Sequence, residues 1–219
     1  SQAMADWSAG ISANAGYYFV DGKETVDNTN VNTDRREALL YFPSIFVEKN
    51  FGQIIVGIDY VPVSLETEEA SRTDYDPTGG LDGADKSGVV NKAQADVDNH
   101  ITLYVSLPAG DTGAYLKLGY SMMEVISKEN LGTGSDYGND DVGGYHGAVG
   151  YQHDLDDSFI RVELGYSAYD DINLTNGTNS ALSNKVEGSL EGATAKISFG
   201  THSTSTAQAL VPSSSLISL

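Results

Sequence analysis

Hydrophobic side chains recur at every second position along most of this chain, and this period of two constrains the fold more than any other feature. Between Trp7 and Phe19, alternate positions hold Trp, Ala, Ile, Ala, Ala, Tyr and Phe, while small or polar residues fill most of the positions between them. Only an extended strand places two such sets on opposite sides of the backbone. The segment is also longer than the roughly 5–6 residues of a usual globular strand.

The same pattern occurs eight times, so the sequence predicts an all-β fold of eight antiparallel strands. The predicted strands cover residues 7–19, 37–48, 53–63, 100–107, 114–122, 145–152, 160–168 and 193–199. The least regular of them, 37–48, is apolar on both faces and contains Pro43. Because proline removes a donor from the strand ladder, a bulge or local break is expected at this position.

The connections between these strands alternate in length. Short segments rich in turn residues cover 49–52, 108–113 and 153–158. Long polar segments, predicted as loops, cover 21–36, 64–99, 126–143 and 169–185. Short connections at one end and long ones at the other indicate an up-and-down meander. Eight such strands close readily into a barrel, which leaves no sheet edge exposed.

The two faces of the predicted strands differ in charge. One face carries Glu48, Asp59, Lys117, Arg161, Glu163 and Lys196. We expect these residues to form a polar network in the lumen, with Arg161 and Lys117 paired to Glu163 or Asp59, because burying an unpaired charge costs several kcal/mol. The opposite face has no charge in its central stretches. It is therefore expected to lie on the outside.

Aromatic residues mark both ends of the apolar face. Those near the long connections are Tyr17, Phe19, Tyr60, Tyr120, Tyr145 and Tyr166. Those near the short turns are Trp7, Tyr151 and Phe199. Two aromatic rings around an apolar band are typical of a transmembrane barrel. No run approaches the roughly 18 apolar residues of a membrane-spanning helix, so a helical membrane protein is excluded.

Composition excludes several other classes of protein. The chain has 31 acidic and 12 basic residues and a formal charge of −19. A nucleic-acid partner is excluded, because binding phosphates requires a surplus of lysine and arginine. The chain has no cysteine, which rules out a disulfide scaffold, a cysteine-ligated metal centre and a thiol nucleophile.

Residues 6–199 resemble the small eight-stranded outer-membrane β-barrels of Gram-negative bacteria. That group includes the transmembrane domain of outer-membrane protein A, the outer-membrane protein X type and the opacity-type adhesins. The resemblance rests on the strand pattern, the aromatic rings and the segment 193–199, which looks like the aromatic-ended last strand that the barrel-assembly machinery reads. It implies contact with outer-membrane lipid and with that machinery during biogenesis.

The two ends of the chain lie outside the predicted barrel domain, 6–199. Residues 1–5 contain Ala3-Met4-Ala5, which fits a signal-peptidase site, so this segment is either the remnant of a signal peptide or a mobile N-terminus. Residues 200–219 form a tail rich in serine and threonine, which departs from the family pattern. The tail is a disordered extension, a segment that binds a neighbour, or sequence of unrelated origin.

The longest predicted loop contains a candidate calcium site. Asp74, Asp76, Thr78, Asp82 and Asp85 hold oxygen atoms at positions 1, 3, 5, 9 and 12 of a calcium-binding loop, with glycine at position 6. Pro77, the aspartate at position 12 and the lack of flanking helices depart from that pattern. The alternative is a solvated acidic loop around which divalent ions gather without a defined site.

Histidines offer the only candidates for catalysis. His100 and His146 fall on the predicted lumen face, and a lipid-modifying barrel would need such a histidine beside a serine or a carboxylate. Ser106 or Ser167 with Glu163 could supply those groups, but nothing in the spacing selects them. Polar residues in a lumen more often fill space and pair, so we predict no enzyme and no cofactor other than a candidate calcium ion.

The sequence thus predicts a non-enzymatic outer-membrane barrel whose acidic extracellular loops have a structural and surface-interaction role. A phage, a host or a neighbouring cell would be the surface partner. One alternative is a narrow channel or transporter for small solutes, which needs a lateral opening hinted at by Pro43. Another is an assembly-forming structural protein whose apolar outer face packs on other subunits.

Overall fold

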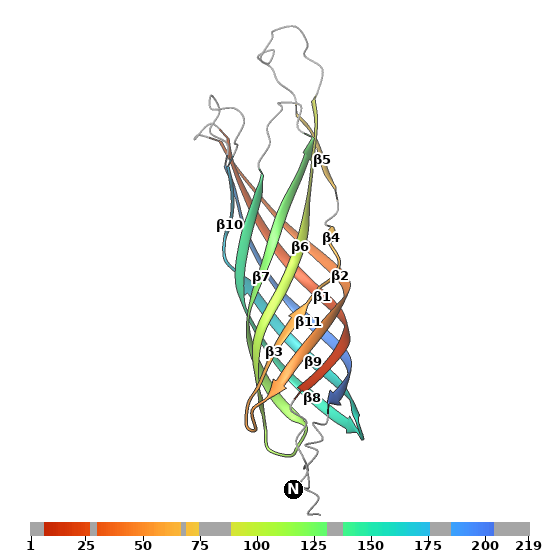
Figure 1. Ribbon diagram of the computed structural model, residues 1–219. Coiled ribbons are helices and arrows are strands. Elements are labelled where there is room, and N and C mark those ends of the chain that lie inside the picture. Colours follow the sequence, from red (N-terminus) through yellow and green to blue (C-terminus); the bar gives the residue numbers. More distant parts are fainter. Residues whose placement is uncertain are drawn as a thin grey trace, which may run out of the picture.

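The chain folds into a closed antiparallel barrel (Figure 1). The computed structural model describes residues 7–26, 30–66, 69–74, 89–130, 138–175 and 185–203. Its strands are β1 (Trp7–Val26), β2 (Asn30–Asn50), β3 (Ile55–Tyr60), β4 (Leu65–Glu66), β5 (Ala70–Asp74), β6 (Val89–Pro108), β7 (Ala114–Asn130), β8 (Asn139–Leu155), β9 (Ser158–Tyr169), β10 (Ile172–Thr175) and β11 (Lys185–Ser203). Within these ranges no helix is long and apolar enough to span a membrane.

Eight strands form the ring, which confirms the predicted fold. The order is β1-β2-β3-β6-β7-β8-β9-β11, and pairing of β11 with β1 closes it. The short strands β4 and β5 pair with β6 above β3, and β10 pairs with β11 above β9. Trp7 at the start of β1 is the register partner of Ser203 at the end of β11. The first strand therefore begins where the last one ends.

The strands are longer than predicted, so the predicted loops were too long. β1 and β2 stay paired up to Val26 and Asn30, well into the predicted loop 21–36. Likewise, β7 runs to Asn130 and β8 begins at Asn139. Hydrophobic alternation stops where the outer face ceases to be apolar, but backbone pairing continues through polar residues. The barrel thus has an extension beyond its apolar band. It includes the paired residues 21–26 of β1 and 30–35 of β2.

The backbones of β2 and β3 are hydrogen-bonded over only part of their length. We call the unpaired part of the wall between them the seam. Their pairing ends at Ile45 and Tyr60. Continuing this register would place Pro43 opposite Pro62, and neither proline has a backbone N–H to donate. β2 itself has no bulge, since its register with β1 is unbroken at the pair Ala13–Pro43. The break expected at Pro43 therefore lies in the β2–β3 ladder and not within β2.

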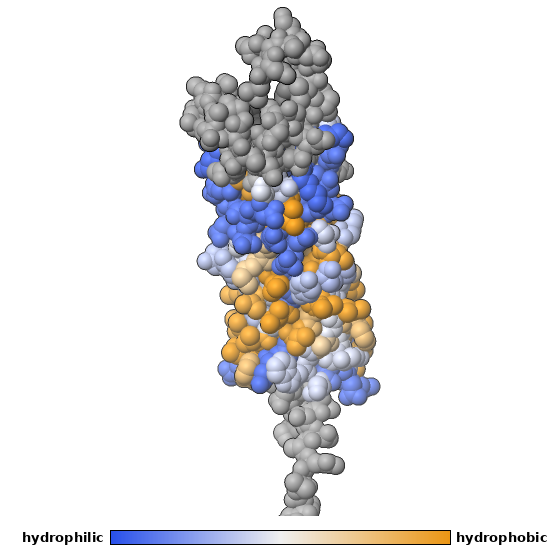
Figure 2. Space-filling model, turned by 45° about the horizontal axis from the view of Figure 1, so that its top comes forward, coloured by the Kyte–Doolittle hydropathy of each residue, from blue (hydrophilic) through white to orange (hydrophobic). Residues whose placement is uncertain are grey.

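The apolar face points outward, as predicted. Figure 2 shows, on the face in view, a belt of hydrophobic residues across the lower part of the barrel, with hydrophilic residues covering the described extension above it. From Trp7 to Tyr17 the belt covers ten residue steps of β1. With about 3.3 Å per residue and a tilt of about 40°, this corresponds to a height of about 25 Å, which matches the apolar band of a transmembrane barrel.

Candidate functional site

The lumen at the short-turn end is filled by an aromatic layer. Phe159 is completely buried, and its ring centroid lies 6.1 Å from that of Phe46. The guanidinium carbon of Arg161 lies 4.8 Å from the Phe159 centroid, a cation–π contact. A Cβ atom at Gly200 would overlap the Phe159 ring. The glycine on the neighbouring strand therefore leaves the space that this ring fills.

Arg161 also anchors the first ion pair of the lumen. Its Nη1 and Nη2 donate to the two carboxylate oxygens of Glu48, at 2.7 and 2.9 Å. Tyr104 donates its hydroxyl to the same carboxylate, at 2.7 Å. Gln152 Oε1 accepts from Arg161 Nη2, also at 2.7 Å. Both charged groups are buried. The bidentate geometry and the further hydrogen bonds therefore replace the hydrogen bonds to water that each group loses on folding.

Two more ion pairs lie in the middle of the lumen. Lys117 Nζ is 2.5 Å from Glu163 Oε1, and it lies 4.2 Å from the centroid of the Tyr104 ring. Lys196 Nζ donates to Asp59 Oδ2, at 2.7 Å. The six charged residues chosen from the sequence therefore point into the barrel and form three pairs.

The partner expected for Arg161 was wrong, whereas Lys117 does pair with Glu163. Arg161 pairs with Glu48 on the far side of the lumen, 113 positions away in sequence, instead of with Glu163 or Asp59. The sequence places residues on a face of a strand, but which faces meet across the lumen depends on the stagger of all the strands around the ring.

A histidine layer lies above the ion pairs. His146 Nδ1 and Ser167 Oγ share a hydrogen bond of 2.9 Å, and His100 Nε2 is 3.0 Å from the hydroxyl oxygen of Tyr169. The cavity bordered by these residues measures only about 40 Å³, which is room for about one or two water molecules. The histidine–serine pair that a catalytic hypothesis would need is therefore present, but its cavity is too small for a lipid substrate.

Apolar side chains fill the lumen above the histidines. Two buried clusters lie there, and partly buried Tyr169 and Leu190 pack against both of them. The clusters consist of Tyr18, Phe42 and Val61, and of Met123, Val125 and Val142. Over the residues that the structure describes, the lumen thus holds an aromatic layer, a paired polar layer and an apolar cap.

The aromatic residues predicted at the ends of the apolar band lie on the outer wall. The exposed ones are Trp7, Tyr17, Tyr120, Tyr145, Tyr151, Tyr166 and Phe199. Phe19 and Tyr60 are half-buried. Some of these rings contact one another edge to face, as in the pair Tyr120–Tyr145 with centroids 5.3 Å apart. Tyr41 is 73% exposed on the same wall. The period of two does not single it out, because its strand is apolar on both faces.

The candidate calcium loop lies almost entirely outside the described residues. Asp74 is the last residue of β5 and pairs with Val89 of β6. Asp76, Thr78, Asp82 and Asp85 fall in the range 75–88, which the structure does not describe. Within the described ranges, no group of three or more histidine or acidic side chains is arranged to hold a metal ion. Calcium binding by this loop stays a prediction.

Two interior residues with clear roles were not selected from the sequence. Tyr104 and Gln152 both bind the Arg161–Glu48 pair. Tyr104 alternates with Thr102 and Ser106 on the inward face of β6, so its position could have been read from the period of two. Gln152 is only half-buried and lies next to a turn. Nothing in its local sequence indicates that it binds Arg161.

No protein-family model and no curated protein matches the chain. Among solved structures, the outer membrane protein OprG from Pseudomonas aeruginosa matches with a TM-score of 0.50 and 13% identity, over 92% of this chain and 99% of that one. The outer membrane protease OmpT from Escherichia coli matches with a TM-score of 0.42 and 10% identity, over 89% and 96% of the two chains. Neisserial surface protein A matches with a TM-score of 0.32 and 12% identity, over 84% and 96%. In fold, this chain is thus an eight-stranded barrel of the small outer-membrane type, similar to OprG.

Proposed function

We propose that this protein spans the outer membrane of a Gram-negative bacterium as a closed, non-enzymatic barrel. Its role would be structural and would include contacts with a partner at the cell surface. The observation that carries this proposal is the filled lumen, with three ion pairs and an apolar cap inside an outer wall that is itself apolar. A barrel built in this way holds its shape in lipid but offers neither a pore nor a substrate pocket.

The extension beyond the apolar band would present the surface contacts. Binding residues concentrate on connections held by a rigid scaffold, and the connections from β5 to β6, from β7 to β8 and from β10 to β11 start from strand ends in this extension. The acidic composition of the chain favours a cationic partner, or one that binds through divalent ions. A phage, a host surface or a neighbouring cell would supply such a partner.

Transport of a small solute is the second candidate function, and the seam between β2 and β3 is the observation that favours it. Above Ile45, no described strand pairs with β2 on this side. Phe42 and Val61 fill the lumen beside the seam and belong to one buried cluster. If both side chains moved, a solute could leave the lumen sideways into the membrane, because no backbone hydrogen bond would have to break.

Permeation measurements distinguish the two functions. The purified protein in planar bilayers should show no stepwise conductance, and liposomes that contain it should not swell in small neutral solutes, because side chains fill the described lumen. Solute-dependent swelling would favour transport over the closed scaffold. In that case, replacing Pro43 and Pro62 by valine should abolish the swelling. Valine restores the two backbone N–H groups that β2 and β3 need to pair across the seam.

A further inference from the structure

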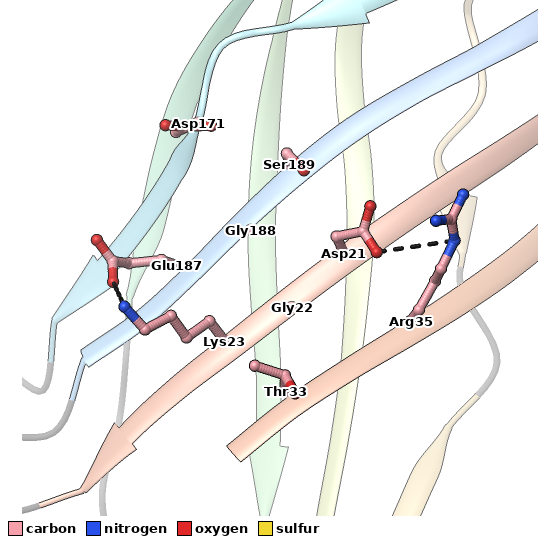
Figure 3. A pocket seen from close by; sticks show the side chains of 9 residues that line it. All are labelled: Asp21, Gly22, Lys23, Thr33, Arg35, Asp171, Glu187, Gly188 and Ser189. Atoms are coloured by element: carbon pink, nitrogen blue, oxygen red, sulfur yellow. Dashed lines mark ion pairs between the residues drawn. The ribbon is translucent and has the colours of Figure 1, made fainter. Parts of the chain in front are cut away.

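A polar pocket lies on the outer wall of the extension, where β11, β1 and β2 run side by side (Figure 3). Its volume is about 630 Å³. Its lining includes Asp21, Lys23, Arg35, Asp171, Glu187 and Ser189. On β1, Asp21 and Lys23 alternate in step with the exposed Tyr17. The outer-wall pocket therefore opens to the surroundings of the barrel and not to its lumen.

This pocket begins directly above the aromatic residues at the upper edge of the apolar band, which include Phe19. Arg35 is the register partner of Asp21, which follows Phe19 by two residues on β1. The guanidinium carbon of Arg35 lies 5.1 Å from the centroid of the Phe19 ring. Two residues along a tilted strand rise by about 5 Å. The pocket is therefore at the level where membrane head groups begin.

The basic groups of the pocket have loosely held partners. Arg35 Nε lies 3.8 Å from Asp21 Oδ1, and Lys23 Nζ lies 3.5 Å from Glu187 Oε2. Three of these four side chains are at least half exposed, and such surface pairs stabilise a fold very little. Both cations can therefore change partner at small cost when a stronger acceptor arrives.

Glu187, one of the acidic groups of the pocket, stays ionised. Lys185 donates to Glu187 at 2.6 Å, and this hydrogen bond, with the charges of Lys185 and Lys23, holds the pKa of Glu187 below its ordinary value. An ionised carboxylate only accepts hydrogen bonds. The pocket thus combines two donors suited to phosphate with acceptors suited to hydroxyl groups.

We propose that the outer-wall pocket binds the phosphorylated sugar head group of an outer-leaflet glycolipid. Arg35 and Lys23 would donate to phosphate oxygens, for which the planar guanidinium is well shaped. Asp21, Glu187 and Ser189 would bind sugar hydroxyl groups. A phospholipid head group is smaller and has few hydroxyls, so it would leave the carboxylates facing its phosphate. The proposal rests on the outer-membrane location proposed above.

Native mass spectrometry of the detergent-solubilised protein tests this binding, with rough lipopolysaccharide as the probe. Wild type should bind it, and the variant Lys23→Gln/Arg35→Gln should bind at least about tenfold more weakly, because charge-assisted hydrogen bonds to phosphate are lost. Lys92→Gln is the matched control. It removes one exposed cation of the extension, paired to Glu69 at 2.7 Å and outside the pocket, and should bind like wild type. The same glycolipid stripped of its phosphates should bind wild type as weakly as the intact one binds the double variant.

Two results would overturn the proposal. One is equal binding of intact glycolipid by wild type and the double variant, with both showing the gel mobility of a folded barrel. The other is binding of phosphatidylglycerol by wild type as tightly as the glycolipid, which would indicate general attraction of anionic lipid. Neither result depends on where wild type is located in the cell. Failure of the pocket and failure of the outer-membrane proposal are therefore separable.

Discussion

Replacing Arg161 by methionine is expected to lower the free energy of unfolding of the barrel by about 3–5 kcal/mol, the cost of breaking a buried ion pair from one side. Glu48 is only 2% exposed, and without Arg161 it would keep the Tyr104 hydroxyl as its hydrogen-bond donor. Methionine also loses the cation–π contact with Phe159. Urea titration of the protein folded in phospholipid vesicles measures the change.

The double variant Glu48→Leu/Arg161→Met separates the charge effect from the change in shape. Removing both charges should recover most of the lost stability, because no carboxylate stays buried without its partner. Lys92→Met serves as the surface control. It breaks a pair between half-exposed side chains and should cost less than about 1 kcal/mol. If Arg161→Met cost no more than Lys92→Met, water would reach Glu48, and the closed lumen would be wrong.

Replacing Ile197 by arginine is expected to cost about 2–4 kcal/mol in a lipid bilayer, because a charge would replace an apolar side chain near the middle of the membrane. Ile197 points outward, is 54% exposed, and pairs with Ala13 on one side and Val162 on the other. Folding titrations in phospholipid vesicles give the value directly.

Thr201→Arg is the matched control on the same strand. Thr201 also points outward on β11, but its register partners, Ala9 and Ser158, place it near the short-turn end. There an arginine reaches the head groups and should cost only about 0–1 kcal/mol. Equal costs at the two positions would mean that the outer face does not meet lipid, and would favour the reading in which it packs on other subunits.

The sequence was sufficient to predict the architecture, because one face of every long strand had to be apolar. The repeated segments Leu118-Gly119-Tyr120-Ser121 and Leu164-Gly165-Tyr166-Ser167 show why. Both tyrosines are exposed on the outer wall, while the serines that follow them are buried in the lumen. A period of two determines this alternation wherever it continues.

Features that depend on several strands at once could not be predicted. The extension carries no hydrophobic alternation, so its sequence does not distinguish its strands from loops. The pairing of Arg161 with Glu48 depends on stagger around the ring, and the β2–β3 seam depends on Pro43 and Pro62 being opposite each other. The outer-wall pocket likewise joins β1, β2 and β11. No single strand shows that Lys23, Arg35 and Glu187 are neighbours.

Membrane fractionation followed by gel electrophoresis, with and without boiling, tests the central claim most directly. A closed transmembrane barrel should sediment with the outer membrane and need detergent for extraction. It should also run faster unboiled than boiled, because the ring stays folded in the detergent. A protein that stayed in solution without detergent, or eluted as a large assembly, would contradict this account. Its apolar belt would then be an interface between subunits.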